Sequence, residues 1–385
     1  MSRVLVTIRA GVPTHNLALY HRIRFTCHDP AVFIELDDGT RKRSILIIRN
    51  VELNRARQLV KSDKIYCPKD FTPPGGLSGD REIATAQAAI ECLRRHAVTR
   101  ACGDRSLPLL YVSLARESGI EIELDADLGV RERRQKDEQE IGYLRQAQRD
   151  TESAIRMACE LIASASARAD GVLMHEGQPL DSRIVRVLID THLMKLGYIN
   201  DQSIVACGPI GADCHNPGEG LLRTGQPVIV DVFPMNKQTL YHGDCTRMVV
   251  HGDVPEVVNR MLAMVSEAKK AAETATRAGA TGDAIHHATV AVLKRHGVHI
   301  GFAPPDAAKD LIFIPHGTGH GIGLDLKEPP LLDFNGPELL VGDAVTIEPA
   351  VYSHAVGGVR LEDLYIVREA GAENLGGLPE GLSWK

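Results

Sequence analysis

One short pattern occurs twice in the second half of the 385-residue chain and limits the possible folds more than any other feature. A glycine, an apolar run and then an acid make up residues Gly225–Asp231, and the same order recurs in Gly342–Glu348. A second acid follows each run at a similar interval, Asp244 after the first and Glu362 after the second. Short apolar runs bounded by glycine are typical of buried strands. The sequence therefore predicts two β-hairpins of similar design, each carrying two carboxylates.

These acids end apolar runs, because Val228–Val230 precede Asp231 and Val345–Ile347 precede Glu348. A buried carboxylate is unfavourable unless a cation or hydrogen bonds compensate it. The segment His316–His320, with the sequence HGTGH, lies between the two patterns. A helical histidine pair for zinc is one interpretation, but the glycines argue against a helix and favour a loop or strand with one metal-binding histidine. Four carboxylates and one imidazole predict two cations that share ligands, with Mn²⁺ favoured by the oxygen-rich set and Co²⁺ or Zn²⁺ as alternatives.

The chain around these acids repeats the order of its elements. Apolar residues at helical spacing predict helices over residues 141–162 and 184–193 before the first hairpin, and over 255–265 and 283–295 before the second. Two helices followed by an acid-bearing hairpin, twice, predict a pseudo-symmetric α+β domain with its site where the halves join. The charged segment Arg131–Glu138 is typical of a solvated linker and marks the expected domain boundary.

The first part of the chain, residues 1–134, alternates predicted strands and helices. A turn at residues 37–39 between apolar runs 31–36 and 44–48 predicts a hairpin, and Asp80 is placed to cap a helix over 80–93. Runs 108–114 and 120–124 are strand-like. Because this part shows no cluster of potential catalytic residues, we expect a smaller α/β domain that is either a scaffold or a domain for oligomerisation and for restricting access to the site.

Composition excludes several classes of protein. Hydrophobic residues make up 44% of the chain and charged residues 24%, as in a soluble globular protein, and the length suggests two domains. The formal charge of −6, with interspersed signs, argues against binding nucleic acid. No apolar run approaches the roughly 18 residues of a membrane span. The eight cysteines show no CxxC pair or regular spacing, which favours a reduced cytoplasmic protein over a disulfide framework.

At the residues named above, the sequence resembles the pita-bread metallopeptidases, specifically the aminopeptidase P and Xaa-Pro dipeptidase (prolidase) branch. The motifs are VDVFP at 230–234, GDCTR at 243–247, HGTGHGIGL at 316–324, TIEP at 346–349 and GVRLED at 358–363. The similarity covers residues 136 to 378, and the first domain is more faintly similar to the family's creatinase-type N-terminal domain through HDP at 28–30 and VELNRAR at 51–57. The resemblance implies a creatinase-like α/β domain over 1–134 and a pita-bread catalytic domain over 135–385. It also implies a homodimer.

The resemblance assigns the five metal ligands position by position. It implies that Asp231 chelates one of two ions, that Asp244 and Glu362 bridge both, and that His320 and Glu348 complete the other. Glu348 would also be the general base for the bridging water, which attacks the peptide as a hydroxide. The implied substrate is a short peptide, either an Xaa-Pro dipeptide or one with proline as its second residue.

Four further residues match positions beside the substrate. His215 and His316 match histidines that contact the peptide and move protons, and Arg360 and Tyr352 match an arginine and a tyrosine that lie behind the ligands or beside the substrate. Without the resemblance, a lone histidine such as His215 is more often a structural hydrogen-bond donor.

Lys327 departs from the family pattern, which usually has a histidine at this position. A lysine ammonium can donate a hydrogen bond to a developing oxyanion, but while protonated it cannot accept a proton. Two alternatives therefore stand beside the peptidase hypothesis. One is a hydrolase or lyase of the same fold acting on a small non-peptide substrate, which Lys327 favours. The other is a binding module without catalysis, which the intact ligand set disfavours.

Overall fold

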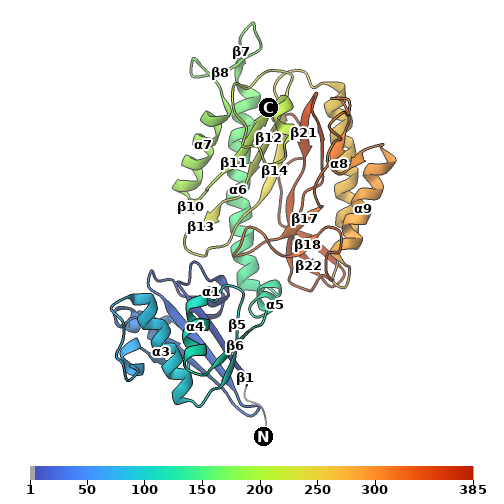
Figure 1. Ribbon diagram of the computed structural model, residues 1–385. Helices are drawn as coiled ribbons and strands as arrows, with labels where there is room; N and C mark the ends of the chain where they lie inside the picture. Colours follow the sequence, from blue (N-terminus) through green and yellow to red (C-terminus); the bar gives the residue numbers. More distant parts are fainter. Residues whose placement is uncertain (1–4, 385) are drawn as a thin grey trace. The chain divides into compact units, whose positions relative to one another are not determined.

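The computed structural model describes residues 5–384, and these divide into two compact units that meet between Arg133 and Arg134 (Figure 1). Each unit has its own buried apolar core. All eight cysteines are free thiols. Within the described part of the chain, we find no helix with both the length and the apolar character to cross a bilayer.

The first unit is built on one mixed sheet with strand order β4-β3-β2-β1-β5-β6. Its strands are β1 (Leu5–Gly11), β2 (Ala31–Asp37), β3 (Lys42–Ile47), β4 (Lys64–Tyr66), β5 (Arg100–Gly103) and β6 (Glu121–Leu124). Its helices are α1 (Leu17–Ile23), α2 (Leu53–Leu59), α3 (Arg81–Arg95), α4 (Leu109–Glu117) and α5 (Val130–Arg134), which runs to the boundary, with short 3-10 turns at Asn50–Glu52 and Pro68–Phe71. The predicted hairpin is confirmed as β2 and β3, and Asp80 accepts a hydrogen bond from the Ile83 N–H at the start of α3.

The predicted strand over 108–114 is wrong, because this segment forms helix α4. Tyr111 and Ala115, four residues apart, are buried on one face, whereas Leu109 is 79% exposed. The continuous apolar run is also compatible with the period of a helix. Pro108, which has no N–H to donate, is the N-cap residue of α4.

The first half of the second unit consists of two helices and a three-stranded sheet. The helices are α6 (Glu138–Ser164) and α7 (Ser182–Lys195), and the sheet has the order β11-β12-β14, with β11 (Ser203–Cys207), β12 (Pro227–Val232) and β14 (Cys245–Val250). Shorter elements are β7 (Ser166–Ala167), β8 (Leu173–His175), β9 (Gln178–Pro179), β10 (Tyr198–Ile199), β13 (Met235–Asn236) and a 3-10 turn at Gly208–Ala212. Asp137 and Glu140 form a capping box at the start of α6.

The second half repeats this plan with α8 (Glu256–Ala275) and α9 (Gly282–Arg295) (Figure 1). Its larger sheet has the order β18-β17-β19-β22-β23, with β17 (Gly319–Gly321), β18 (Glu328–Leu332), β19 (Ala344–Ile347), β22 (Asp363–Arg368) and β23 (Gly371–Asn374). A smaller sheet has the order β15-β16-β20-β21, with β15 (His299–Ile300), β16 (Phe313–Ile314), β20 (Ala350–Ser353) and β21 (Gly357–Arg360). The four predicted helices of this unit are confirmed, and the unit has the pseudo-symmetric α+β architecture expected.

Strand alternation explains why Asp231 faces the join between the halves. Val228, Val230 and Val232 of β12 pack into the core beside α6 and α7, whereas Ile229 packs into the core shared with α8. Since side chains two residues apart share a face, Asp231 points with Ile229 toward the second half.

The second acidic pattern is less simple than the predicted hairpin. Strands β19 and β22 pair antiparallel, with Ile347 opposite Asp363, but the β20–β21 hairpin lies between them in the chain and belongs to another sheet. Glu348 and Glu362 therefore flank an inserted hairpin rather than a tight turn. A bridge between Thr246 and Glu362 connects the acidic strands of the two halves.

The prediction of a solvated linker over Arg131–Glu138 is wrong at two positions. The Lys136 ammonium is buried and lies 2.7 Å from a Glu328 carboxylate oxygen. Arg134 forms an ion pair of 2.6 Å with the buried Asp343. These charges are tied into the second unit, because each finds an acid that a solvated linker would lack.

Candidate metal centre

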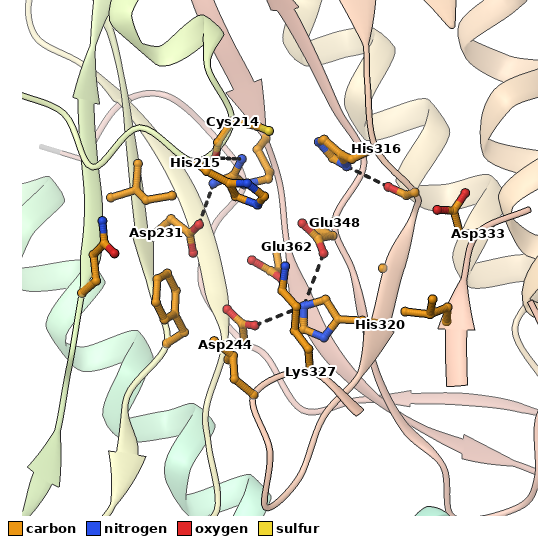
Figure 2. Close-up of a pocket in the computed structure, with 18 residues that line it drawn as sticks. Cys214, His215, Asp231, Asp244, His316, His320, Lys327, Asp333, Glu348 and Glu362 are labelled. Atoms are coloured by element: carbon orange, nitrogen blue, oxygen red, sulfur yellow. Dashed lines mark hydrogen bonds and ion pairs between the residues drawn. The ribbon is translucent and has the colours of Figure 1, made fainter. Parts of the chain in front are cut away.

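A cavity of about 370 Å³ lies where the two halves of the second unit join (Figure 2). Nine of the ten side chains assigned from the sequence line it; Tyr352 does not. The lining residues are Gln202, Ile204, Cys214, His215, Asp231, Phe233, Asp244, His316, Gly317, Gly319, His320, Leu326, Lys327, Leu331, Asp333, Glu348, Arg360 and Glu362.

The predicted ligands converge on one side of this cavity. One ligand atom each from Asp244, His320 and Glu362 lies within 4.8 Å of the other two. The Nε2 atom of His320 is 3.7 Å from Asp244 Oδ2 and 3.5 Å from Glu348 Oε1. Asp231 lines the same cavity and forms an ion pair of 2.5 Å with Arg360.

The backbone around His320 fixes which ring nitrogen faces the acids. Its Nδ1 lies 3.0 Å from the Gly321 carbonyl oxygen, to which it donates, so Nε2 keeps its lone pair toward Asp244 and Glu348. Gly319 allows β17 to approach β19 closely, since a Cβ atom there would lie 2.0 Å from the Thr346 carbonyl oxygen. The glycines of HGTGH thus place one imidazole, that of His320, as a candidate ligand.

Burial and mutual repulsion dominate the electrostatics of the four acids. Burial, followed by the charges of Asp231 and Glu348, raises the pKa of Asp244 well above its usual value. Burial, followed by the charges of Asp244 and Glu348, does the same to the pKa of Glu362. Burial also raises the pKa of Asp231 despite the neighbouring Arg360.

Glu348 behaves differently from the other three acids. Burial would raise its pKa, but interactions with His320, His316, Arg360 and Lys327 lower it below the usual value. Its side chain is also 19% exposed, more than those of the other ligands. Glu348 is therefore the ionised carboxylate of the group that is most accessible from the cavity.

These residues fit a group of divalent cations. The Oδ1 atom of Asp231 is buried and has no hydrogen-bond partner among the described residues. An orphaned carboxylate oxygen beside further buried acids and an imidazole lone pair is the donor chemistry that a divalent ion satisfies.

Two residues that hold the ligands were missed by the sequence reasoning. The Thr246 hydroxyl donates to Glu362 Oε2 over 2.8 Å and accepts from Arg360 Nε over 3.2 Å. The side-chain oxygen of Gln148 on α6 accepts from the Asp244 N–H over 3.2 Å. Thr246 could have been found from its place inside the GDCTR motif, whereas no local signal marks Gln148.

His316, Tyr352 and Arg360 form a hydrogen-bonded chain at the edge of the centre. Arg360 Nη1 donates to the Tyr352 hydroxyl over 2.9 Å, and this hydroxyl lies 2.8 Å from His316 Nε2. Because His316 Nδ1 donates to the Gly317 carbonyl, Nε2 accepts from Tyr352. Tyr352 is fully buried, so it acts on the cavity through His316 and Arg360.

His215 and Lys327 are exposed residues of the cavity lining. The cavity also has apolar walls and a further acid that the sequence reasoning did not single out, namely Ile204, Phe233, Leu326, Leu331 and Asp333. Single apolar residues on short strands and loops carry no pattern that would distinguish a cavity wall from an ordinary core position.

A pseudo-symmetric α+β fold with buried carboxylates and a histidine at its join defines a metal-dependent hydrolase of the pita-bread class. Residues 143–369 match the model of Metallopeptidase family M24, and the chain belongs to this family. It is thus a metallopeptidase, and divalent metal ions are its expected cofactors.

Relatives and solved structures agree with this assignment. The chain is 30% identical over 280 residues to "Probable dipeptidase PepE" of Mycobacterium tuberculosis, covering 72% of this chain and 68% of that protein. It is 29% identical over 175 residues to the Xaa-Pro dipeptidase of Pyrococcus furiosus, covering 45% and 46%. The structure of an Xaa-Pro dipeptidase from Bacillus anthracis has the same fold, with a TM-score of 0.77 at 21% identity over 98% of this chain and 94% of that one.

Proposed function

We propose that this protein hydrolyses short peptides in which proline follows the scissile bond, using two divalent ions held by Asp231, Asp244, His320, Glu348 and Glu362. The observation that carries the proposal is the approach of Asp244, His320 and Glu362 to within 4.8 Å, with Glu348 3.5 Å from the same imidazole. Preference for proline is suggested by the relatives described as Xaa-Pro dipeptidases.

The ions, when bound, polarise the scissile carbonyl and lower the pKa of a water toward neutrality. Glu348 is the proposed general base, because its lowered pKa leaves it ionised and its carboxylate is partly open to the cavity. Arg360 orients Asp231 through their 2.5 Å ion pair, and its charge opposes the rise that burial causes in the pKa of Asp231. His215 and His316 are the proposed contacts of the peptide, and Tyr352 fixes the orientation of the His316 ring.

The identity of the ion, the assembly and the location are also proposals. Four carboxylates and one imidazole favour Mn²⁺, with Co²⁺ or Zn²⁺ able to substitute. A homodimer follows from the family resemblance and is tested by light scattering. A cytoplasmic location follows from the eight unpatterned cysteines and is tested by cell fractionation.

The test combines metal analysis with a substrate panel on one preparation. Mn²⁺-loaded protein is expected to hydrolyse Xaa-Pro dipeptides or Xaa-Pro-Yaa tripeptides faster than matched peptides with alanine in place of proline. His320→Ala is expected to lose bound metal and at least about a hundredfold in kcat/KM, because it removes a ligand and not merely an outer contact. Absence of hydrolysis with every ion and peptide would refute the proposal, and full activity in Glu348→Ala would refute the assignment of the base.

A further inference from the structure

Two basic side chains line the cavity, Arg360 and Lys327, and they differ in the partners that they contact. Arg360 is 3% exposed and donates to Asp231, Thr246, Tyr352 and the Cys214 carbonyl. Lys327 is exposed and has no hydrogen bond or ion pair to any residue between 5 and 384. Lys327 therefore supplies an ammonium that no direct ion pair with a described residue holds in place.

The backbone on both sides of Lys327 is held, although its ammonium is not. The next residue, Glu328, is buried and forms the 2.7 Å ion pair with Lys136. Upstream, the Gly323 carbonyl accepts from the His242 N–H over 3.0 Å. The side chain consequently starts from a fixed position beside the metal ligands.

Figure 2 shows the Lys327 side chain extending toward His320, Glu348 and Asp244. Burial raises the pKa of Asp244, and the charge of Lys327 acts in the opposite direction, as expected for an ammonium near this carboxylate. Without cations, these acids attract Lys327. Once divalent ions neutralise the acids, the ammonium faces positive charge and requires an anion.

The opposite side of the cavity carries a further acid. Asp333 lies on the His316 side of Glu348, whereas Lys327 lies on the side of Asp244 (Figure 2). A substrate carboxylate near Asp333 would meet like charge. The cavity lining also includes apolar side chains such as Phe233 and Leu326, which suit a pyrrolidine ring rather than an anion.

We propose that Lys327 is the anion-binding group of this cavity and that it selects peptides ending one residue after the scissile bond, namely dipeptides with a free carboxylate. This inference rests on the proposed function. In a dipeptide the terminal carboxylate lies about one residue length, or ~3.8 Å, from the bond that is cut, so one ammonium next to the centre can reach it. A longer or amidated peptide has a neutral carbonyl there, which gains less from a cation.

The kinetic test compares an Xaa-Pro dipeptide with its C-terminal amide. The wild-type protein is expected to prefer the free acid by roughly tenfold or more in kcat/KM, the size typical of one charge-assisted hydrogen bond. Lys327→Gln is expected to bring the ratio close to one, and Lys327→Arg to retain most of it. Lys294→Gln, an exposed position on α9, removes the same charge elsewhere and is expected to keep the wild-type ratio. A full preference in Lys327→Gln would overturn the proposal.

A binding test separates this inference from the proposed function. L-proline and L-prolinamide are titrated into the metal-loaded protein by calorimetry, which requires no turnover. If the wild type binds proline more tightly than prolinamide and Lys327→Gln binds the two equally, the anion site is supported even when no peptide is cut. If the wild type also binds the two ligands equally, the anion site is refuted.

Metal titration supplies a readout that a purely structural role would not give. Lys327→Gln is expected to bind Mn²⁺ several-fold more tightly than the wild type, because the substitution removes a like charge from beside the ions. An unchanged or weaker affinity would show that Lys327 does not face the centre.

Discussion

Each carboxylate of the metal centre has a different set of neighbours, and this difference divides their chemical roles. Asp231 is ion-paired with Arg360, Glu362 accepts from Thr246, and the charges of Asp231 and Glu348 act on Asp244. Glu348 has positive neighbours and a lowered pKa. In the absence of cations, Asp244 and Glu362 therefore carry most of the electrostatic strain.

A pH-dependent stability difference is expected from Asp244 in the metal-free protein. The pKa of Asp244 in the folded protein lies above the unfolded value of about 3.9. The contribution of this carboxyl to stability is therefore fully present below about pH 3.9 and is lost as the pH rises through the folded pKa. Asp244→Asn should therefore raise Tm little at about pH 5 and more at about pH 8. Thermal unfolding of both proteins after chelation measures this.

The control for this experiment is Asp306→Asn, which changes an exposed acid. Its Tm difference from the wild type should stay flat over the same pH range. If the Tm difference of Asp244→Asn were equally independent of pH, the pKa of Asp244 would not be raised in the folded protein.

Thr246 offers a test of how the ligands are held. Thr246→Val keeps the β-branched shape that suits β14 but removes the hydroxyl that donates to Glu362. We expect Mn²⁺ affinity to fall by roughly tenfold to a hundredfold with secondary structure unchanged. Thr85→Val, at a buried threonine of the first unit, is the matched control, and calorimetric titration is the measurement.

At the scale of elements, a buried ionic network lies behind strands β14 and β22. Asp363, next to the ligand Glu362, binds Arg247 over 2.6 Å and Lys269 over 2.5 Å, and Lys269 also binds Glu380. Arg247 further donates to the Glu362 carbonyl over 2.7 Å. The neighbouring group of Glu152, Cys245 and Asp363 has the spacing of a metal site, but Arg247 and Lys269 already neutralise it.

Loss of one member of this network is expected to destabilise the second unit. Lys269→Met leaves Asp363 and Glu380 without a buried cation, which should lower the free energy of unfolding by about 3–5 kcal/mol. Lys270→Met, at an exposed neighbour on α8, should change it by no more than ~0.5 kcal/mol. Denaturant unfolding measures both, and similar values would mean that the network does not stabilise the unit.

At the scale of the whole molecule, the two units have separate cores and the metal centre belongs to one of them. Chains with several domains often unfold in more than one step. Calorimetry of the full chain is expected to show two transitions, of which Mn²⁺ raises only one, because a ligand stabilises the unit that binds it. A single transition, or an equal shift of two, would contradict this expectation.

The sequence by itself determined the set of candidate ligands and the repeated plan of the second unit. Asp231 and Glu348 each stand at the end of an apolar run, and such local order survives in the fold because buried strands keep their side-chain alternation. Similar reasoning located the predicted helices, whose apolar spacing agrees with their buried faces. The same reasoning failed at α4, because its short apolar run is compatible with both the helical and the strand period.

Tertiary structure alone decided which distant residues complete the site. Gln148 reaches Asp244 across 96 positions in the chain, Lys136 reaches Glu328 across 192, and the β20–β21 hairpin inserts between Glu348 and Glu362. Packing also placed the Tyr352 hydroxyl against His316 and left the Lys327 ammonium without a direct ion pair among the described residues. Such pairings depend on how separate elements pack in three dimensions, and no periodicity or spacing along one chain records that packing.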